Sequence, residues 1–295
     1  MNFTKMHGLG NDFIVIEDFA QNSVDWPELA RRLCHRRFGV GADGLALLQA
    51  GEKARYRLRI FNADGSEAEM CGNALRVAGK YLYERGFVRE AVFQLEMQQA
   101  VKTLRLQLAG GHVSAVEVDM GKPVLDSADV PVSGPMRQVV GEELAAAGRL
   151  FKITAVSMGN PHCVIFGGDP ELVPLREWGP AIETHALFPR KTNVEFAEVL
   201  SAGEVRVRVF ERGVGETLAC GSGACAVLVA GVLNGLLDRR AQIRLPGGTL
   251  LVEWREDGHV YMSGPAAEVF RGELVSAGAH YSKEEETESS AYSAG

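Results

Sequence analysis

Two Cys-Gly steps, at positions 71–72 and 220–221, are the parts of this sequence best suited to chemistry. Each precedes a segment with the pattern of a buried helix, and the second segment carries no charge until Asp238. The first turn of a helix offers free backbone N–H groups and the positive end of the helix dipole, which favour a thiolate over a thiol. A thiolate can remove a proton and a thiol can return one. Cys71 and Cys220 are therefore candidate acid/base groups, whereas Cys225 is expected to pack in the core.

The chain matches itself at an offset of 149 residues. Residues 10–16 fall on 159–165, residues 57–61 fall on 206–210, and the first Cys-Gly step falls on the second. A duplicated fold would by itself retain core residues, but a retained Gly-Asn, at 10–11 and 159–160, gains nothing from a core. The repeat therefore predicts a duplicated domain with one functional group in each half.

Local patterns place these groups where strands end and helices begin. Residues 55–61 alternate with period two and predict a strand, and the apolar run 13–16 predicts a buried one. Helices are predicted over 27–37 and 180–187, and short alternating runs over 92–119 predict a β-meander. Cys71 then follows a strand and a loop, a common location for reactive groups.

The repeat and the composition divide the chain into four parts. Residues 1–122 are predicted to form the first half and 150–275 the second, whose last strand is free to pack on the first domain. Residues 123–149 contain three prolines and are predicted to connect the halves. Residues 276–295 are rich in Ser, Glu and Ala and are predicted to be disordered.

Differences between the two halves select further site residues. His162 stands where the first half has Phe13, next to the retained Asn160, so a packing residue has become a titratable one. The pair Glu-Arg at 211–212 replaces Asn-Ala at 62–63, where the preceding strand ends a few residues before the cysteine. These side chains are expected to face the same site as the cysteines.

The composition argues against several classes of protein. A formal net charge of −7 and the lack of a basic cluster with interleaved aromatics argue against a nucleic-acid partner. No apolar run is long enough to span a membrane, and the N-terminal residues lack the apolar core of a signal peptide. Five irregularly spaced cysteines predict reduced thiols in a cytoplasm, without a second Cys or His pair to complete a zinc site. The glycines of 39–44 have dinucleotide-fingerprint spacing, but a helix precedes them and a strand follows, the reverse of the required order.

Two equivalent helix N-termini, each with a cysteine, predict a site with pseudo-twofold symmetry between the domains. An anion there would accept N–H bonds from both helices. A thiolate on one side could remove a proton while a thiol on the other returned one. That arrangement suits inversion at a carbon next to a carboxylate, with the developing charge stabilised by the converging N–H groups.

Three motifs, at residues 5–13, 61–73 and 211–223, resemble those of bacterial diaminopimelate epimerases. The resemblance extends from Met1 to about Gly272. It implies an α+β fold of two pseudo-symmetric domains, each a mostly antiparallel sheet wrapped around a central buried helix. It also implies a cytoplasmic homodimer that needs neither pyridoxal phosphate nor a metal. Its small-molecule substrate would be diaminopimelate, interconverted between the LL and meso isomers for lysine and peptidoglycan synthesis.

The resemblance also implies roles for individual residues. Cys71 would deprotonate the LL isomer and Cys220 would protonate the opposite face, with the roles exchanged in reverse. His162 and Glu211 would orient the reacting centre. The substrate would be bound by Asn11, Asn62, Gly72, Asn73, Asn160, Asn193, Glu211, Arg212, Gly221 and Ser222. Within that set, the backbone N–H groups of 72–73 and 221–222 would hold the α-carboxylate. Arg212 is our candidate for the distal carboxylate, because its planar fork suits bidentate recognition.

Three other functions compete with this interpretation. A proline- or hydroxyproline-type racemase also uses two cysteines, but it needs no residue for a distal carboxylate such as Arg212. A redox protein could cycle a disulfide between Cys71 and Cys220, although no Cys-x-x-Cys motif is present. A non-catalytic amino-acid-binding protein would use the asparagines and leave the cysteines idle.

Overall fold

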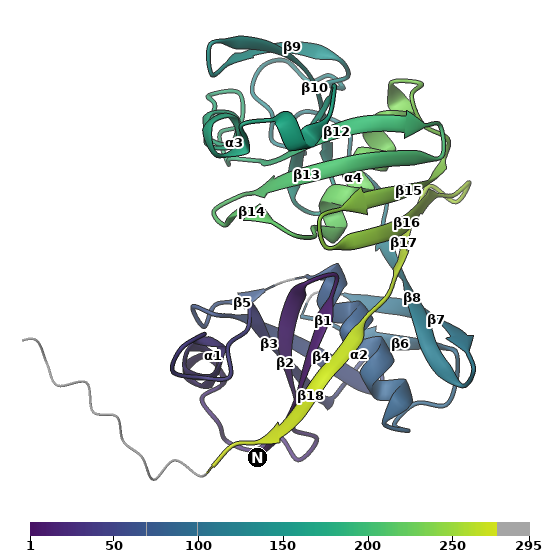
Figure 1. The fold of residues 1–295 in the computed structure, drawn as a ribbon. Helices are drawn as coiled ribbons and strands as arrows, with labels where there is room; N and C mark the ends of the chain where they lie inside the picture. The colour runs from purple at the N-terminus through teal and green to yellow at the C-terminus, as the bar shows by residue number, and fades with distance from the viewer. Residues whose placement is uncertain (69, 99, 276–295) are drawn as a thin grey trace, which may run out of the picture.

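The computed structural model describes residues 1–68, 70–98 and 100–275, which form two lobes connected by crossing strands (Figure 1). The predicted disordered tail, 276–295, lies outside the described residues. Within the described ranges, no helix is both long and apolar enough to cross a membrane.

The first half of the chain supplies the lower lobe of Figure 1 and one strand of the upper lobe. Its elements are β1 (Asn2–Gly8), β2 (Asn11–Glu17), α1 (Trp26–Cys34), β3 (Gly44–Ala50), β4 (Tyr56–Asn62), β5 (Glu67–Ala68), α2 (Gly72–Glu84), β6 (Val92–Glu96), β7 (Val101–Ala109), β8 (His112–Gly121) and β9 (Glu142–Ala146).

The second half repeats this order. Its elements are β10 (Arg149–Ser157), β11 (Pro161–Phe166), a short 3-10 helix η1 (Pro170–Leu172), α3 (Leu175–Glu183), β12 (Asn193–Ser201), β13 (Glu204–Glu211), β14 (Gly215–Thr217), α4 (Gly221–Leu233), β15 (Arg240–Leu245), β16 (Gly248–Trp254), β17 (Val260–Gly264) and β18 (Ala267–Glu273). The offset of 149 residues relates α2 to α4 and α1 to α3 along their whole lengths.

Strand pairing repeats as well. In the first half β2 pairs with β3, and β4 with β6, in parallel, and in the second half β11 pairs with β12, and β13 with β15, in parallel. The other ladders are antiparallel, and β8 pairs with its own counterpart β17 where the halves meet. The fold class is confirmed: each half is a mostly antiparallel sheet that curves around one helix.

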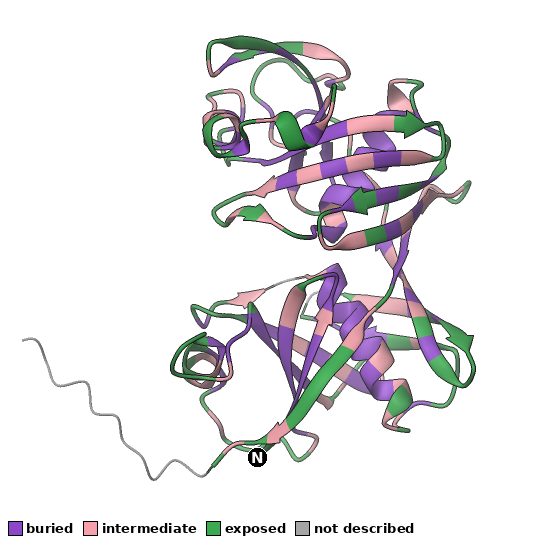
Figure 2. Cartoon of the chain, in the orientation of Figure 1, coloured by how far each residue is buried: buried purple, intermediate pink, exposed green. Residues whose placement is uncertain are grey.

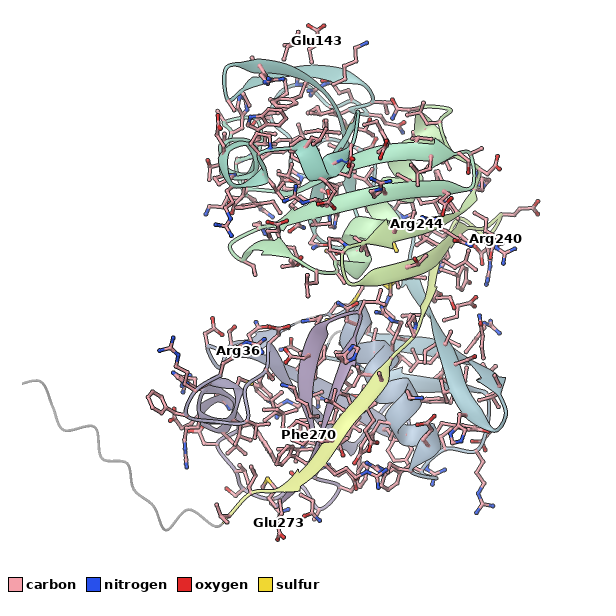
Figure 3. All side chains as sticks on the ribbon, viewed as in Figure 1. Arg36, Glu143, Arg240, Arg244, Phe270 and Glu273 are labelled. Atoms are coloured by element: carbon pink, nitrogen blue, oxygen red, sulfur yellow. The ribbon has the colours of Figure 1, made fainter. Side chains whose placement is uncertain are left out.

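The two halves exchange their last strands. β9 pairs with β10 of the second half, and β18 returns from the upper lobe to pair with β1 of the first (Figure 1). The exposed ring of Phe270 on β18 packs edge-to-face against buried Phe3, with the ring centroids 6.0 Å apart (Figure 3). Between β8 and β9, Val130 and Val132 are buried in the core of the second lobe. The domain boundaries stay a prediction.

The two central helices are largely buried (Figure 2). All residues of α4 from Gly223 to Gly231 are buried, because the helix is apolar on every side. In α2 the buried set includes one charged side chain, Arg76, with no exposed surface.

Two helices begin and end at different residues from those predicted. α1 begins at Trp26, where Asp25 accepts the N–H of Glu28, and it ends three residues before the predicted end, Arg37. α3 begins five residues before Pro180 and ends at Glu183. Pro180 lies inside this helix, and the prediction for 180–187 was wrong because it took the proline for a helix start.

Candidate active site

The two cysteines occupy equivalent positions at the starts of the two central helices. Cys71 is the N-cap residue of α2 and is partly exposed, and Cys220 is the N-cap residue of α4 and is 5% exposed. The backbone N–H of Gly223 donates to Cys220 Sγ at 3.3 Å. Each thiol therefore follows a strand and a loop and lies at the N-terminus of a helix, as the sequence predicts.

The first turns of these helices converge on the side chain of Met262 from β17. A Cβ added at Gly72 would lie 2.8 Å from Met262 Cε, and one added at Gly221 would lie 3.0 Å from its Sδ. Asn73 Nδ2 also donates across the boundary, to the carbonyl oxygen of Ala219 at 3.3 Å. The backbone N–H groups of both helices therefore face one shared region between the lobes.

Asparagines retained by the repeat lie beside this region. Asn11 follows Gly10, whose φ of +85° favours glycine, and its Oδ1 accepts a hydrogen bond from Asn73 Nδ2 at 3.0 Å. Cys71 Sγ lies 3.8 Å from the same oxygen. The Asn11 amide nitrogen donates to Asp43 Oδ2 at 2.9 Å, which fixes the orientation of the amide.

In the second half, a buried pair supports the equivalent asparagine. His162 Nε2 lies 3.0 Å from Asn160 Oδ1, and His162 Nδ1 donates to Glu195 Oε1 at 2.7 Å. Neither His162 nor Glu195 has exposed side-chain surface. The second carboxylate oxygen of Glu195 has no hydrogen-bond partner among the described residues.

The residues at the end of β13 are held by a second asparagine. Buried Asn193 accepts the backbone N–H of Arg212 at 2.8 Å and donates to the carbonyl oxygen of Pro161 at 3.0 Å. Glu211 Oε1 accepts the hydroxyl of Thr217 at 2.5 Å. Arg212 is exposed and donates to the carbonyl oxygen of Arg190 at 3.2 Å.

Asn62 and Ser222, two of the predicted binding residues, have hydrogen-bond contacts within their own half of the described chain. Asn62 is exposed at the end of β4 and donates to Ser66 Oγ at 2.9 Å. Ser222, in the first turn of α4, has its hydroxyl oxygen 3.5 Å from Cys220 Sγ. The structure thus joins Cys71, Asn11 and Asn73 by direct contacts, and Asn73 also reaches Ala219, the residue before Cys220.

Burial changes the expectation for the thiols. Desolvation raises the pKa of Cys71, although backbone N–H groups of residues 73 and 74 oppose the rise. Desolvation, with Glu211 and Glu195 nearby, raises the pKa of Cys220 well above its ordinary value. Desolvation also raises the pKa of Glu211. The helix ends alone predicted thiolates, but in the substrate-free site burial outweighs the helix ends.

Four residues that hydrogen-bond to the side chains of the site were not predicted from the sequence. These are Asp43, Arg76, Glu195 and Thr217. Glu195 did carry a usable signal, because it is a single charge in the buried stretch from Asn193 to Ala197. Among the described residues, no group of three or more His, Cys, Asp or Glu side chains could hold a metal ion.

Gly223 is the position where a single methyl group should disturb the site most directly. A Cβ at Gly223 would lie 2.7 Å from Glu195 Oε1 and 3.2 Å from Cys220 Sγ, so one of these groups must move. We expect Gly223→Ala to lower turnover by about 10²-fold, the cost of a displacement of about 1 Å at a reacting group. Gly203→Ala is the control, because a Cβ there meets nothing within 4 Å. Equal turnover in the two variants would contradict the assigned geometry.

Comparison with known proteins finds relatives that match nearly the whole chain. A family model described as diaminopimelate epimerase matches residues 3–125 and 154–269. Proteins named diaminopimelate epimerase from Pelotomaculum thermopropionicum and Desulforudis audaxviator are 55% and 57% identical to this chain. The first match covers 92% of this chain and 98% of the relative, and the second covers 94% and 100%.

The fold also occurs in more distant proteins. The crystal structure of a hydroxyproline epimerase from Agrobacterium vitis has a TM-score of 0.68 and 15% identity, over 93% of this chain and 90% of that one. That likeness concerns the fold. The family model and the two relatives that are more than 50% identical identify the protein as an isomerase. The chain belongs to the diaminopimelate epimerase family.

Proposed function

We propose that the protein interconverts LL- and meso-2,6-diaminopimelate by a two-base mechanism that uses Cys71 and Cys220 and no cofactor. One observation carries the mechanism: the two cysteines cap equivalent helices whose first turns converge on the same side chain, Met262. The substrate is taken from the names of the relatives, which match nearly the whole chain.

The α-carboxylate of the substrate would bind between the two helix starts. Backbone N–H groups of 72–73 and 221–222 belong to the first turns of the helices, where they have no partner within the helix, and both helix dipoles favour negative charge at that point. Asn11 and Asn160 flank the helix starts from the two halves and would accept the α-ammonium group through their amide oxygens. Charge that develops next to the carboxylate during the reaction would be stabilised by the same N–H groups.

The reaction then needs only the exchange of two protons. Cys71 as a thiolate removes the proton from the α-carbon of the LL isomer and becomes a thiol. The electron pair stays on the α-carbon, delocalised into the carboxylate, until the thiol of Cys220 donates its proton to the opposite face. Cys220 is left as a thiolate, so the reverse reaction starts from that state. Glu211 and His162 would orient the reacting centre beside Cys220.

The far end of the substrate would be recognised by one half only. Arg212 would pair with the distal carboxylate, while Asn62 and Asn193 would line the rest of the distal site together with Glu211. Arg212 is suited to this because it is exposed and its guanidinium donates, among the described residues, only to the carbonyl oxygen of Arg190. In the cell, we place the activity in a cytoplasmic homodimer that serves lysine and peptidoglycan synthesis.

Isotope exchange tests the proposal directly. Reduced protein is incubated with LL-diaminopimelate in D₂O, and the isomers and their mass are followed by chiral chromatography and mass spectrometry. We expect the meso isomer with deuterium at one α-carbon. A parallel incubation with L-proline tests the racemase alternative and is expected to give no exchange. If folded, reduced protein exchanged neither substrate, both the epimerase proposal and the racemase alternative would be overturned.

A further inference from the structure

The offset of 149 residues allows the surroundings of the two cysteines to be compared position by position. Several positions next to the helix starts differ in charge between the halves, among them Glu211, which stands where the first half has Asn62. Two positions differ in charge and are fully buried. Arg76 in α2 corresponds to Cys225 in α4, and Glu195 in β12 corresponds to Ala46 in β3.

Arg76 is a buried cation without an acidic partner. Its guanidinium donates to Asn73 Oδ1 at 2.9 Å and to the carbonyl oxygens of Pro265 and Gly72 at 3.3 and 3.5 Å. Among the described residues it forms no ion pair with a carboxylate. Burial of an unpaired cation is costly, so this charge favours any anion that forms near it. Arg76 reaches the start of the same helix through the carbonyl oxygen of Gly72, the residue after Cys71. Burial and Glu211 raise the pKa of Cys71, and Arg76 lowers it.

The other cysteine has the opposite surroundings. Glu195 Oε1 lies against the first turn of α4, 2.7 Å from where a Cβ of Gly223 would be. Its second oxygen is buried and lacks a partner among the described residues. Glu211 from β13 also faces Cys220, and both carboxylates raise the pKa of this thiol. The ring of His162 on β11 lies beside these carboxylates, with its Nδ1 2.7 Å from Glu195 Oε1.

We propose that Arg76 and Glu195 are positioning residues that set the order in which the cysteine pair ionises, so that Cys71 is the first to become a thiolate while Cys220 stays a thiol. The inference rests on the proposed two-base function. A symmetric pair would ionise at either side with equal ease, and half of the molecules would meet the LL isomer in the wrong protonation state. The charge difference biases the free enzyme toward the state that accepts the LL isomer. It also favours return to that state after each turnover that leaves Cys220 ionised.

Alkylation of the substrate-free protein measures this bias. Reduced protein is treated with iodoacetamide from pH 6 to 10, and labelling of the peptides with Cys71 and Cys220 is followed by mass spectrometry. The midpoint pH of each rate profile is compared rather than the rate, because Cys71 is the more exposed thiol. We expect the midpoint of Cys71 to lie at least about one pH unit below that of Cys220.

Two variants test the residues assigned. Arg76→Met should raise the Cys71 midpoint by about one pH unit, and Arg76→Lys should restore most of the difference. Glu195→Gln keeps the shape of the side chain and should lower the Cys220 midpoint. Glu198→Gln is its control, because Glu198 lies three residues further along β12, 3.5 Å from Arg206. If Arg76→Met fails to fold, Arg76→Lys and Glu195→Gln still decide the question.

The outcomes separate this inference from the proposed function. A Cys220 midpoint below that of Cys71, or midpoints unmoved by Glu195→Gln and by the Arg76 variants, would overturn the inference even in an active epimerase. A protein without isotope exchange but with the expected midpoints would overturn the proposed function and leave the charge difference intact. As a kinetic readout, Glu195→Gln should shift the pH profile of kcat, whereas a purely structural role would lower kcat at every pH.

Discussion

Cys220→Ala is expected to lower the rate of epimerisation by about 10³-fold or more, since a positioned proton donor contributes about 10² to 10⁴ to a reaction rate. Cys71→Ala should have a similar effect. In the proposed mechanism each thiol serves one face of the α-carbon, and the burial of Cys220 leaves little room for water to replace its thiol. Turnover is measured by chiral chromatography in both directions.

Cys225→Ala is the matched control for this loss. Cys225 lies in the same helix, five residues on, and is fully buried. Removal of its sulfur leaves a small cavity and should cost about 1 kcal/mol of stability, with turnover within a few-fold of the unmodified protein. If Cys225→Ala and Cys220→Ala lost activity to the same extent, the loss would reflect disturbance of α4 rather than removal of a proton donor.

Arg212→Ala is expected to reduce kcat/KM for diaminopimelate by about 100-fold, because a hydrogen bond to a charged group is worth about 1.5–3 kcal/mol. Arg212→Lys should recover only part of this loss, since an ammonium group cannot form two parallel bonds to a carboxylate. The backbone of Arg212 is held by Asn193, so truncation of its side chain should leave the fold unchanged.

The control for Arg212 is Arg176→Ala, which removes an exposed arginine from α3. A second comparison uses L-lysine, which lacks the distal carboxylate. The unmodified protein should discriminate strongly against lysine as a substrate for α-proton exchange, and Arg212→Ala should discriminate less. Unchanged discrimination would show that Arg212 does not recognise the distal carboxylate.

Much of the architecture could be predicted because the two halves of the sequence match at a constant offset, which indicates a duplicated fold. The offset of 149 residues fixed the equivalence of Cys71 and Cys220, and both are N-cap residues in the structure. The segment after Cys220 is apolar on every side, which leaves few alternatives to a buried helix, and the repeat extends that prediction to the segment after Cys71. Asn11 and Asn160 were identified for the same reason, since the repeat retains them.

The supporting residues could not be predicted because they depend on which strands are neighbours. Glu195 reaches His162 only because β11 and β12 pair in parallel, with His162 opposite Asn193. Nothing in the sequence distinguishes Arg76 from an exposed arginine of a helix, and only the three-dimensional packing shows that its guanidinium is enclosed. The ionisation of the thiols depends on burial in the same way. The helix dipole is a local property, but desolvation is set by the whole fold.

The exchange of β9 and β18 makes the chain nearly a closed ring. The backbone N–H of Leu274 donates to the carbonyl oxygen of Met1 at 2.8 Å, so the two ends of the described fold meet. A circular permutant that joined these ends and was opened between β8 and β9 or after β9 would keep every strand beside its present neighbours. In such a molecule the helix of Cys220 would come before the helix of Cys71. The order of the two halves along the polypeptide is therefore dispensable for the fold, whereas neither half has a complete sheet without a strand from the other.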